Sequence, residues 1–153
     1  MIFPGSEAVD AALKLSILHF RSIGQSQRTR FIARKSSYHG SSVAALALGY
    51  HARRRGMYKG ILAHDGVNFS HVSRAHAYRD QMPGQSEEQY VAELAQELDD
   101  EFQAVGPENV CAFVAEPVVG AVGSRFIENA RLDANVVGRV LPRPLLLRVI
   151  SQP

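Results

Sequence analysis

Residues 86–117, SEEQYVAELAQELDDEFQAVGPENVCAFVAEP, decide the fold class. The spacing of Ser86 and Gln89 is that of a capping box, which predicts the start of a helix. Apolar residues then recur at helical intervals before Gly106-Pro107, where the helix is expected to end: Val91, Leu94, Ala95, Leu98 and Phe102. The apolar run 110–115 is typical of a strand covered on both faces. A helix followed by such a strand indicates an α/β protein with a largely parallel sheet.

Segments before this stretch continue the alternation of helices and strands. A helix is expected after Ser6, its N-cap, and the apolar residues Leu15 and Leu18 on a second face predict that it is buried on most sides. The sequence further predicts a strand at 30–34 and then a helix capped by Ser41 or Ser42 and closed by Gly49. The 50–85 stretch is expected to be irregular, apart from a short strand near 71–73. A last strand is expected at 145–150.

Composition limits the function classes. The chain has 153 residues, of which 46% are hydrophobic and 21% charged, as expected of one globular domain. No apolar run approaches the ~18 residues of a membrane span, and no secretory signal is recognisable. Residues 121–153 carry a charge of +3, from five arginines against two acidic residues, and residues 1–120 carry −1, which gives the net charge of +2. Bulk charge therefore does not indicate nucleic-acid binding. The single cysteine, Cys111, excludes an internal disulfide, and its position in an apolar strand predicts a raised pKa.

Three short motifs could carry chemistry. Gly5-Ser6 precedes or opens a helix, where free backbone N–H groups can hold a phosphate. Tyr38-His39-Gly40 joins a strand to a helix, so the Tyr38 ring could stack on a planar ligand and His39 could act as acid or base. Glu116 follows a strand at the same expected edge of the sheet. Each motif also fits a purely structural role, respectively a capped helix, a hydrogen-bonded turn and a solvated acid.

Other sites are less favoured by the sequence. The six histidines include no HExxH pair, and with one cysteine no metal site is expected. The arginines at 53–55, flanked by Tyr50 and Tyr58, could contact nucleic acid, although a solvated loop is the preferred interpretation.

The order of these motifs resembles one family. The segments GSEAVDAALKL (5–15), FIAR (31–34), SYHG (37–40), YRD (78–80) and GPENVCAFVAEPVVGA (106–121) resemble the class III aminotransferases, the ω-amino-acid and ornithine-type branch of the fold type I pyridoxal-phosphate enzymes. The resemblance covers about residues 3–122. It implies part of the α/β large domain of that fold, pyridoxal 5'-phosphate as cofactor, amino-group transfer from an amine or ω-amino acid to a keto acid, and a homodimer.

The resemblance also implies roles for single residues. Gly5 and Ser6 match the turn that binds the cofactor phosphate, and Tyr38 matches the aromatic residue that stacks on the pyridine ring. His39 matches a neighbour of that residue, structural or near the cofactor, and Glu116 matches the acid that organises hydrogen bonds around the cofactor. Arg79 matches an arginine without a catalytic role.

Departures from the family pattern shape the functional prediction. Residues 123–153 have no family match and contain no strand ending in Asp-Glu, so residues 1–122 are expected to form a partial cofactor-binding domain and 123–153 a divergent tail. The Schiff-base lysine is not expected among the chain's three lysines, Lys14, Lys35 and Lys59. The chain is therefore expected to be a truncated fragment that has no catalytic residue and is inactive alone. Its expected location is the cytoplasm.

Two alternatives remain open from the sequence. One is a non-catalytic protein of the same family that binds pyridoxal phosphate or phosphate, or pairs with a full-length homologue. The other is an unrelated small basic binding module that uses Tyr50–Tyr58.

Overall fold

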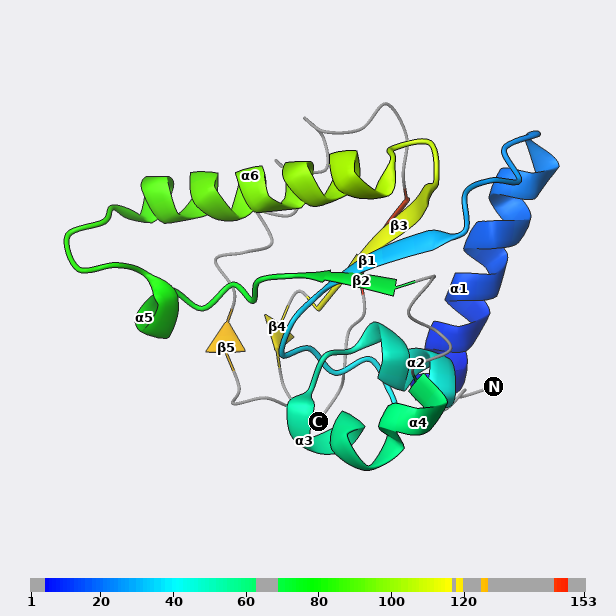
Figure 1. Ribbon diagram of the computed structural model, residues 1–153, viewed down its shortest axis with the longest axis horizontal. Helices are drawn as coiled ribbons and strands as arrows, with labels where there is room; N and C mark the ends of the chain where they lie inside the picture. The colour runs from blue at the N-terminus through cyan, green and yellow to red at the C-terminus, as the bar shows by residue number, and fades with distance from the viewer. Residues whose placement is uncertain (1–4, 63–68, 117, 120–124, 127–144, 149–153) are drawn as a thin grey trace.

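A parallel four-stranded sheet forms the centre of the computed structural model, which describes residues 5–62, 69–116, 118–119, 125–126 and 145–148. Its order is β2-β1-β3-β6, and Figure 1 shows β1, β2 and β3 at its centre. The strands are β1 (Arg30–Arg34), β2 (Phe69–Val72), β3 (Val110–Ala115) and β6 (Leu145–Arg148), and every pairing is parallel. Helices lie on both faces, which confirms the predicted α/β class.

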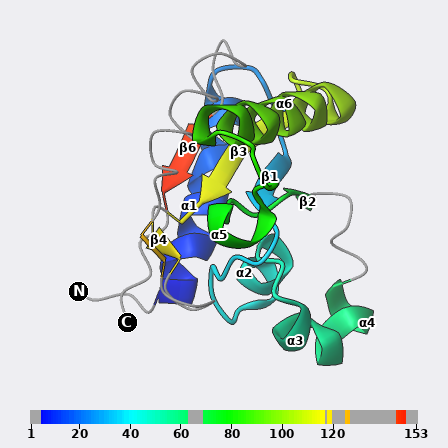
Figure 2. The same cartoon turned by 90° about the vertical axis from the view of Figure 1, so that its left-hand side faces the viewer.

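Helix α6 (Glu87–Val105) covers one face of the sheet (Figure 2). The predicted capping box is present: the Ser86 side chain accepts a hydrogen bond from the Gln89 backbone N–H, and the Gln89 side chain accepts one from the Ser86 N–H. The helix ends before Gly106, whose φ of 87° is a conformation that glycine adopts without strain. Its apolar stripe, which includes the fully buried Leu98 and Phe102, packs on side chains of β1 and β3.

Helices α1 (Gly5–Ser22) and α2 (Val43–Leu48) cover the opposite face. Helix α1 buries Val9, Leu13 and Phe20 against the sheet. The expectation that α1 is buried on most sides is wrong, because Leu15 and Leu18 are 63% and 62% exposed. Helix α2 begins and ends as expected, with the Ser42 hydroxyl accepting from the Ala45 N–H and Gly49 as the C-cap residue.

The 50–85 stretch is more regular than its sequence predicts. Its described residues include α3 (Ala52–Arg55), the 3₁₀ turn η1 (Gly56–Tyr58), α4 (Lys59–Leu62) and α5 (Ala77–Asp80). These elements are too short to show a helical period, which explains why pattern reasoning missed them. The strand expected near 71–73 is confirmed as β2.

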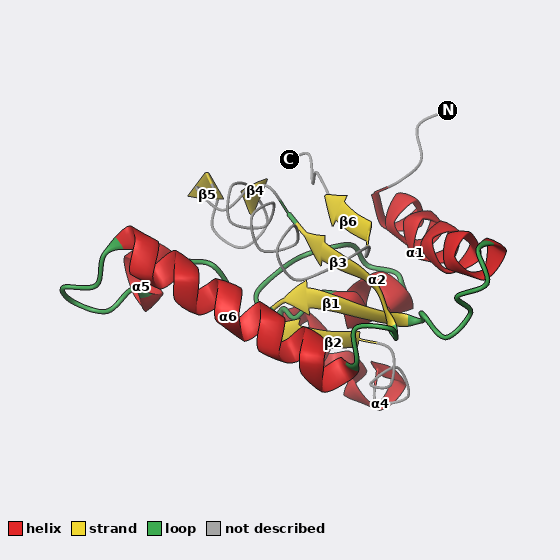
Figure 3. Ribbon diagram, turned by 90° about the horizontal axis from the view of Figure 1, so that it is seen from above, coloured by secondary structure: helices red, strands yellow, loops and turns green. Residues whose placement is uncertain are grey.

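The last described elements follow β3. A short antiparallel pair joins β4 (Val118–Val119) to β5 (Arg125–Phe126), and β6 then adds to the edge of the main sheet beside β3 (Figure 3). The strand expected at 145–150 is confirmed over Leu145–Arg148, and positions 149 and 150 lie outside the described residues. No helix among the described residues is long and apolar enough to cross a membrane.

Candidate functional site

The start of α1 meets the turn that follows β1. The Ser6 Oγ accepts a hydrogen bond from the Ser41 N–H at 2.9 Å and lies 3.3 Å from the Ser41 Oγ. A second bond joins the same two segments, because the Ser42 hydroxyl donates to Asp10 at 2.7 Å. Two of the motifs predicted from the sequence, Gly5-Ser6 and 38–40, are thus brought together at one end of the sheet.

Gly40 makes this approach possible. Its φ is 141°, and a Cβ at this position would lie 2.7 Å from the Ser6 Oγ and 2.9 Å from both the Ser6 Cα and the Ala45 Cβ. Because one of these atoms belongs to the backbone of α1, a side chain could be accommodated only by moving the turn or the helix. Gly40 therefore sets the distance between the turn and the α1 N-terminus.

The prediction that Ser6 caps its own helix is wrong. Helix α1 already includes Gly5, so Ser6 lies in its first turn, and its hydroxyl reaches the Ser41 N–H instead of an amide of α1. The first N–H groups of an α-helix have no acceptor within the helix, and the positive end of its dipole lies there. The described part of α1 begins at Gly5, so Gly5 and Ser6 lie towards the positive end of its dipole, which favours an anion there.

Glu116, the third motif, holds the turn of the second motif in place. It follows β3 directly and is 3% exposed, so the interpretation as a solvated loop acid is wrong. Its Oε2 accepts a hydrogen bond of 3.1 Å from the Tyr38 N–H. A buried carboxylate from β3 therefore positions the backbone of Tyr38, whose side chain remains partly exposed.

His39 lies in the same turn but faces the interior. It is 3% exposed, and neither ring nitrogen has a hydrogen-bond partner among the described residues. Burial lowers the pKa of His39 to about 4, and the charge of His71 contributes in the same direction. The ring is therefore neutral at pH 7, which favours a structural role over general-acid catalysis.

This burial predicts acid sensitivity. Since the His39 pKa is about 4 in the folded chain and near 6.5 when unfolded, only the unfolded state gains the proton between these values. Stability from neutral His39 is complete above pH 6.5 and is lost as pH falls towards 4. Urea midpoints measured from pH 7.5 to 4 should fall in the wild-type chain.

The His39→Asn variant should flatten this slope, leaving the part due to His71, whose pKa is also lowered by burial. The exposed His19→Gln change is the matched control and should leave the slope intact. An unchanged slope in His39→Asn would disprove the contribution of His39.

The arginine run is built into this site. The prediction of a solvated loop is wrong as to the loop, since residues 52–55 form α3, but Arg53 and Arg54 are exposed to solvent as expected. The Arg54 guanidinium lies over the Tyr38 ring, 4.1 Å from its centroid, and Arg55 donates to the carbonyl oxygens of Ala47 and Gly49 at 3.0 and 2.9 Å. Sequence reasoning missed both contacts; the only signal was the position of the arginines just after the small-residue helix.

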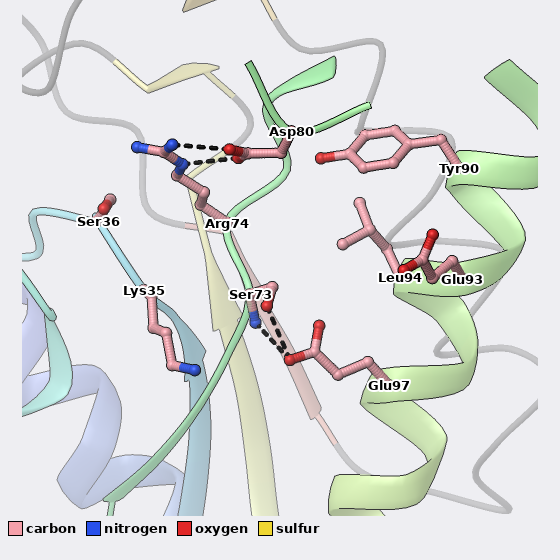
Figure 4. Close-up of a pocket in the computed structure, with 9 residues that line it drawn as sticks. All are labelled: Lys35, Ser36, Ser73, Arg74, Asp80, Tyr90, Glu93, Leu94 and Glu97. Carbon is pink, nitrogen blue, oxygen red and sulfur yellow. Dashed lines mark hydrogen bonds and ion pairs between the residues drawn. The ribbon is translucent and has the colours of Figure 1, made fainter. Parts of the chain in front are cut away.

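A cavity of about 500 Å³ lies between helix α6 and the ends of β1 and β2 (Figure 4). Arg74 and Asp80 form a two-bonded ion pair of 2.7 Å at one end, and Glu97 accepts from both the N–H and hydroxyl of Ser73 at 2.9 Å. None of the five predicted cofactor-binding residues lines this cavity. Arg79 is exposed on α5 beside it.

Other chemistry finds little support in the described ranges. No group of histidine, cysteine, aspartate or glutamate residues within them could hold a metal ion. Burial raises the pKa of the Cys111 thiol to about 12, as its place in an apolar strand predicts. Of the five predicted cofactor-binding residues, only Tyr38 and His39 line the small cavity beside the 37–40 turn, while Ser6 bonds to Ser41 and Glu116 to the Tyr38 N–H.

Comparison with known proteins identifies the family. The family model for "Aminotransferase class-III" matches residues 1–134. An aminotransferase of Gibberella zeae is 48% identical over 119 residues, which are 76% of this chain and 23% of the relative. A mitochondrial γ-aminobutyrate transaminase of Oryza sativa subsp. indica is 34% identical over 125 residues, covering 78% of this chain and 22% of the relative.

The fold agrees with this assignment. The crystal structure of the ω-transaminase from Pseudomonas jessenii in complex with PMP superposes with a TM-score of 0.82 at 30% identity, over 94% of this chain and 31% of that one. The chain thus spans about a quarter of the length of the curated relatives named above. On the family match, the identities and the shared fold, this chain belongs to the class III aminotransferases.

Proposed function

We propose that this chain forms the phosphate-binding and ring-stacking side of a pyridoxal-phosphate site in a class III aminotransferase. The observation that carries the proposal is the contact between Ser6 and the 40–41 turn, which joins the α1 N-terminus to the residues beside Tyr38. Gly5 and Ser6 would hold the cofactor phosphate, and Tyr38 would stack on its pyridine ring. The family and the PMP complex of the P. jessenii relative support this choice of cofactor.

The residues present fit such a ligand. The α1 N-terminus offers amide donors to an anion, the Ser6 hydroxyl lies beside them, and Gly40 presents no side chain there. Glu116 fixes the backbone of Tyr38 by accepting its N–H, and His39 adds no charge at neutral pH. When bound, pyridoxal phosphate supplies the electron sink for amino-group transfer, while these residues bind and orient it.

The proposed activity of the whole protein is amino-group transfer from an amine or ω-amino acid to a keto acid. The name of the rice relative, γ-aminobutyrate transaminase, supports an ω-amino acid as donor. A homodimer and a cytoplasmic location stay predictions. So does the boundary at residue 122, although the tail contributes β6 to the main sheet.

A Schiff base with the cofactor would need one of the chain's three lysines. Lys14, Lys35 and Lys59 are all exposed, and none lines the small cavity beside Tyr38 and His39. We therefore propose that the 153-residue chain binds pyridoxal phosphate reversibly and does not transaminate alone. The same observation favours the second candidate function, a non-catalytic cofactor- or phosphate-binding protein derived from the family.

Titration of the chain with pyridoxal phosphate, followed by absorbance, tests the phosphate site. Ser6→Ala removes the hydroxyl at the α1 N-terminus and is expected to weaken binding about tenfold, the value of one hydrogen bond to a charged group. Inorganic phosphate should compete with the cofactor. Ser22→Ala is the matched control, because within the described part of the chain its hydroxyl donates to the His19 carbonyl at the other end of α1.

Failure would be recognisable in two ways. Equal affinities for Ser6→Ala, Ser22→Ala and wild type would place the phosphate elsewhere. Borohydride treatment followed by peptide mass spectrometry is expected to leave all three lysines unmodified. A stoichiometric adduct on Lys14, Lys35 or Lys59 would overturn the proposal of reversible binding.

A further inference from the structure

We infer that Arg54 is a positioning residue for the cofactor ring, covering one face of Tyr38 so that the pyridine ring stacks on the other. This inference rests on the proposed function, because it assumes that Tyr38 contacts pyridoxal phosphate. It adds a residue from outside the three motifs and gives a role to part of the arginine run in α3.

The contact geometry is that of a cation–π pair. The guanidinium carbon of Arg54 lies 4.1 Å from the Tyr38 ring centroid, well inside the ~6 Å range of this interaction. No aromatic ring of the described residues stacks on Tyr38. Arg54 covers one face of the Tyr38 ring, and no second guanidinium or aromatic ring of the described residues covers the other, which is the face we assign to the planar ligand.

Helix α3 presents Arg54 from a fixed position. Its neighbour Arg55 donates to the carbonyl oxygens of Ala47 and Gly49 at the end of α2 and lies 4.6 Å from the Tyr50 ring centroid. These contacts hold α3 against the α2 C-terminus, next to the turn that carries Tyr38. Arg54 lies on this anchored helix. Its guanidinium therefore restricts the Tyr38 ring more than the guanidinium of an arginine on a free loop would.

The other neighbour provides a control. Arg53 is exposed and makes no hydrogen bond or ring contact with the described residues. Three consecutive arginines thus have separate expected roles: Arg53 in solvent, Arg54 against Tyr38, and Arg55 as the anchor of α3. Substituting each in turn distinguishes a specific contact from a general effect of positive charge.

The test is pyridoxal-phosphate titration of alanine variants of the full 153-residue chain, with melting temperatures measured beside it. Arg54→Ala is expected to weaken binding about 3- to 10-fold, the range of one cation–π contact. Arg53→Ala should stay within about twofold of wild type, and Arg55→Ala should lower the melting temperature. Arg54→Lys should recover part of the affinity, because lysine keeps the charge but not the planar group.

A double-mutant cycle with Tyr38 shows whether Arg54 acts through the ring. In a Tyr38→Leu background, Arg54→Ala should change affinity less than about twofold, since the stacked pair is already gone. In a Tyr38→Phe background, which keeps an aromatic ring, the full loss should persist. A purely structural role of Arg54 would give the same loss in both backgrounds.

Four outcomes would overturn the inference. Tighter binding by Arg54→Ala would mean that the guanidinium occupies the cofactor's face of Tyr38. An equal loss in the Tyr38→Leu background would mean that Arg54 does not act through the Tyr38 ring, but structurally or by its charge. Unchanged binding by Arg54→Ala, with wild type binding normally, would refute the role of Arg54 and leave the proposed function intact, whereas no binding by wild type would refute both.

Discussion

Gly40→Ala is expected to abolish pyridoxal-phosphate binding and to lower the free energy of unfolding by about 3 kcal/mol. Two costs add at this position. The φ of 141° disfavours any residue with a side chain, and the new methyl group would lie within 3 Å of three atoms, including the Ser6 Cα. Relief requires the 38–41 turn to move away from α1, which separates Ser6 from Tyr38.

Two other glycines make matched controls for this change. Gly24→Ala meets a φ of 77° but has open space around it, so it measures backbone strain without a collision. Gly60→Ala, in α4, meets neither strain nor a neighbour, and should be neutral or slightly stabilising. Urea unfolding and pyridoxal-phosphate titration of all three variants give the comparison. Wild-type affinity in Gly40→Ala would show that the close approach is not needed for binding.

Phe102→Ala is expected to lower the free energy of unfolding by about 3–5 kcal/mol, the usual cost of removing a buried aromatic ring. Phe102 is 0% exposed and belongs to the core between α6 and the sheet, together with Leu98 and Phe113. Native stabilities are only about 5–15 kcal/mol, so this single change removes a large share of the total.

The exposed face of α1 supplies the comparison for Phe102. Leu15→Ala, at a side chain 63% exposed, should stay within about 0.5 kcal/mol of wild type. Because α6 and α1 lie on opposite faces of the sheet, Phe102→Ala should reduce stability while its folded fraction keeps the wild-type cofactor affinity. A urea midpoint for Phe102→Ala equal to that of Leu15→Ala would contradict the described packing of α6.

Much of the fold was predictable because its main elements carry local signals. The capping box at Ser86, the helical stripe of α6 and the continuous apolar run of β3 each lie within one segment, and the structure confirms all three. The short elements α3, α4 and α5 were missed because four residues cannot display a period. The extent of burial of α1 was also mispredicted, since apolar composition alone does not tell which face meets the sheet.

The site likewise separates what local sequence signals predict from what depends on tertiary contacts. The sequence singled out Gly5, Ser6, Tyr38, His39 and Glu116, and their order in the chain indicated the family that the comparisons confirm. Which of them touch one another did not follow from that order. Ser6 contacts Ser41 across 35 positions and Glu116 contacts Tyr38 across 78, so both contacts depend on how the strands are arranged.

By itself, then, the sequence determined the α/β class, the principal helices and strands, and the family, because hydrophobic period, caps and short motifs are local properties of the chain. Only the tertiary structure decided that Glu116 is buried and accepts the Tyr38 N–H, that Gly40 closely approaches Ser6, and that Arg54 covers the Tyr38 ring. The physical reason is that β3 pairs directly with β1, which places the carboxyl ends of two strands distant in sequence beside the N-terminus of α1.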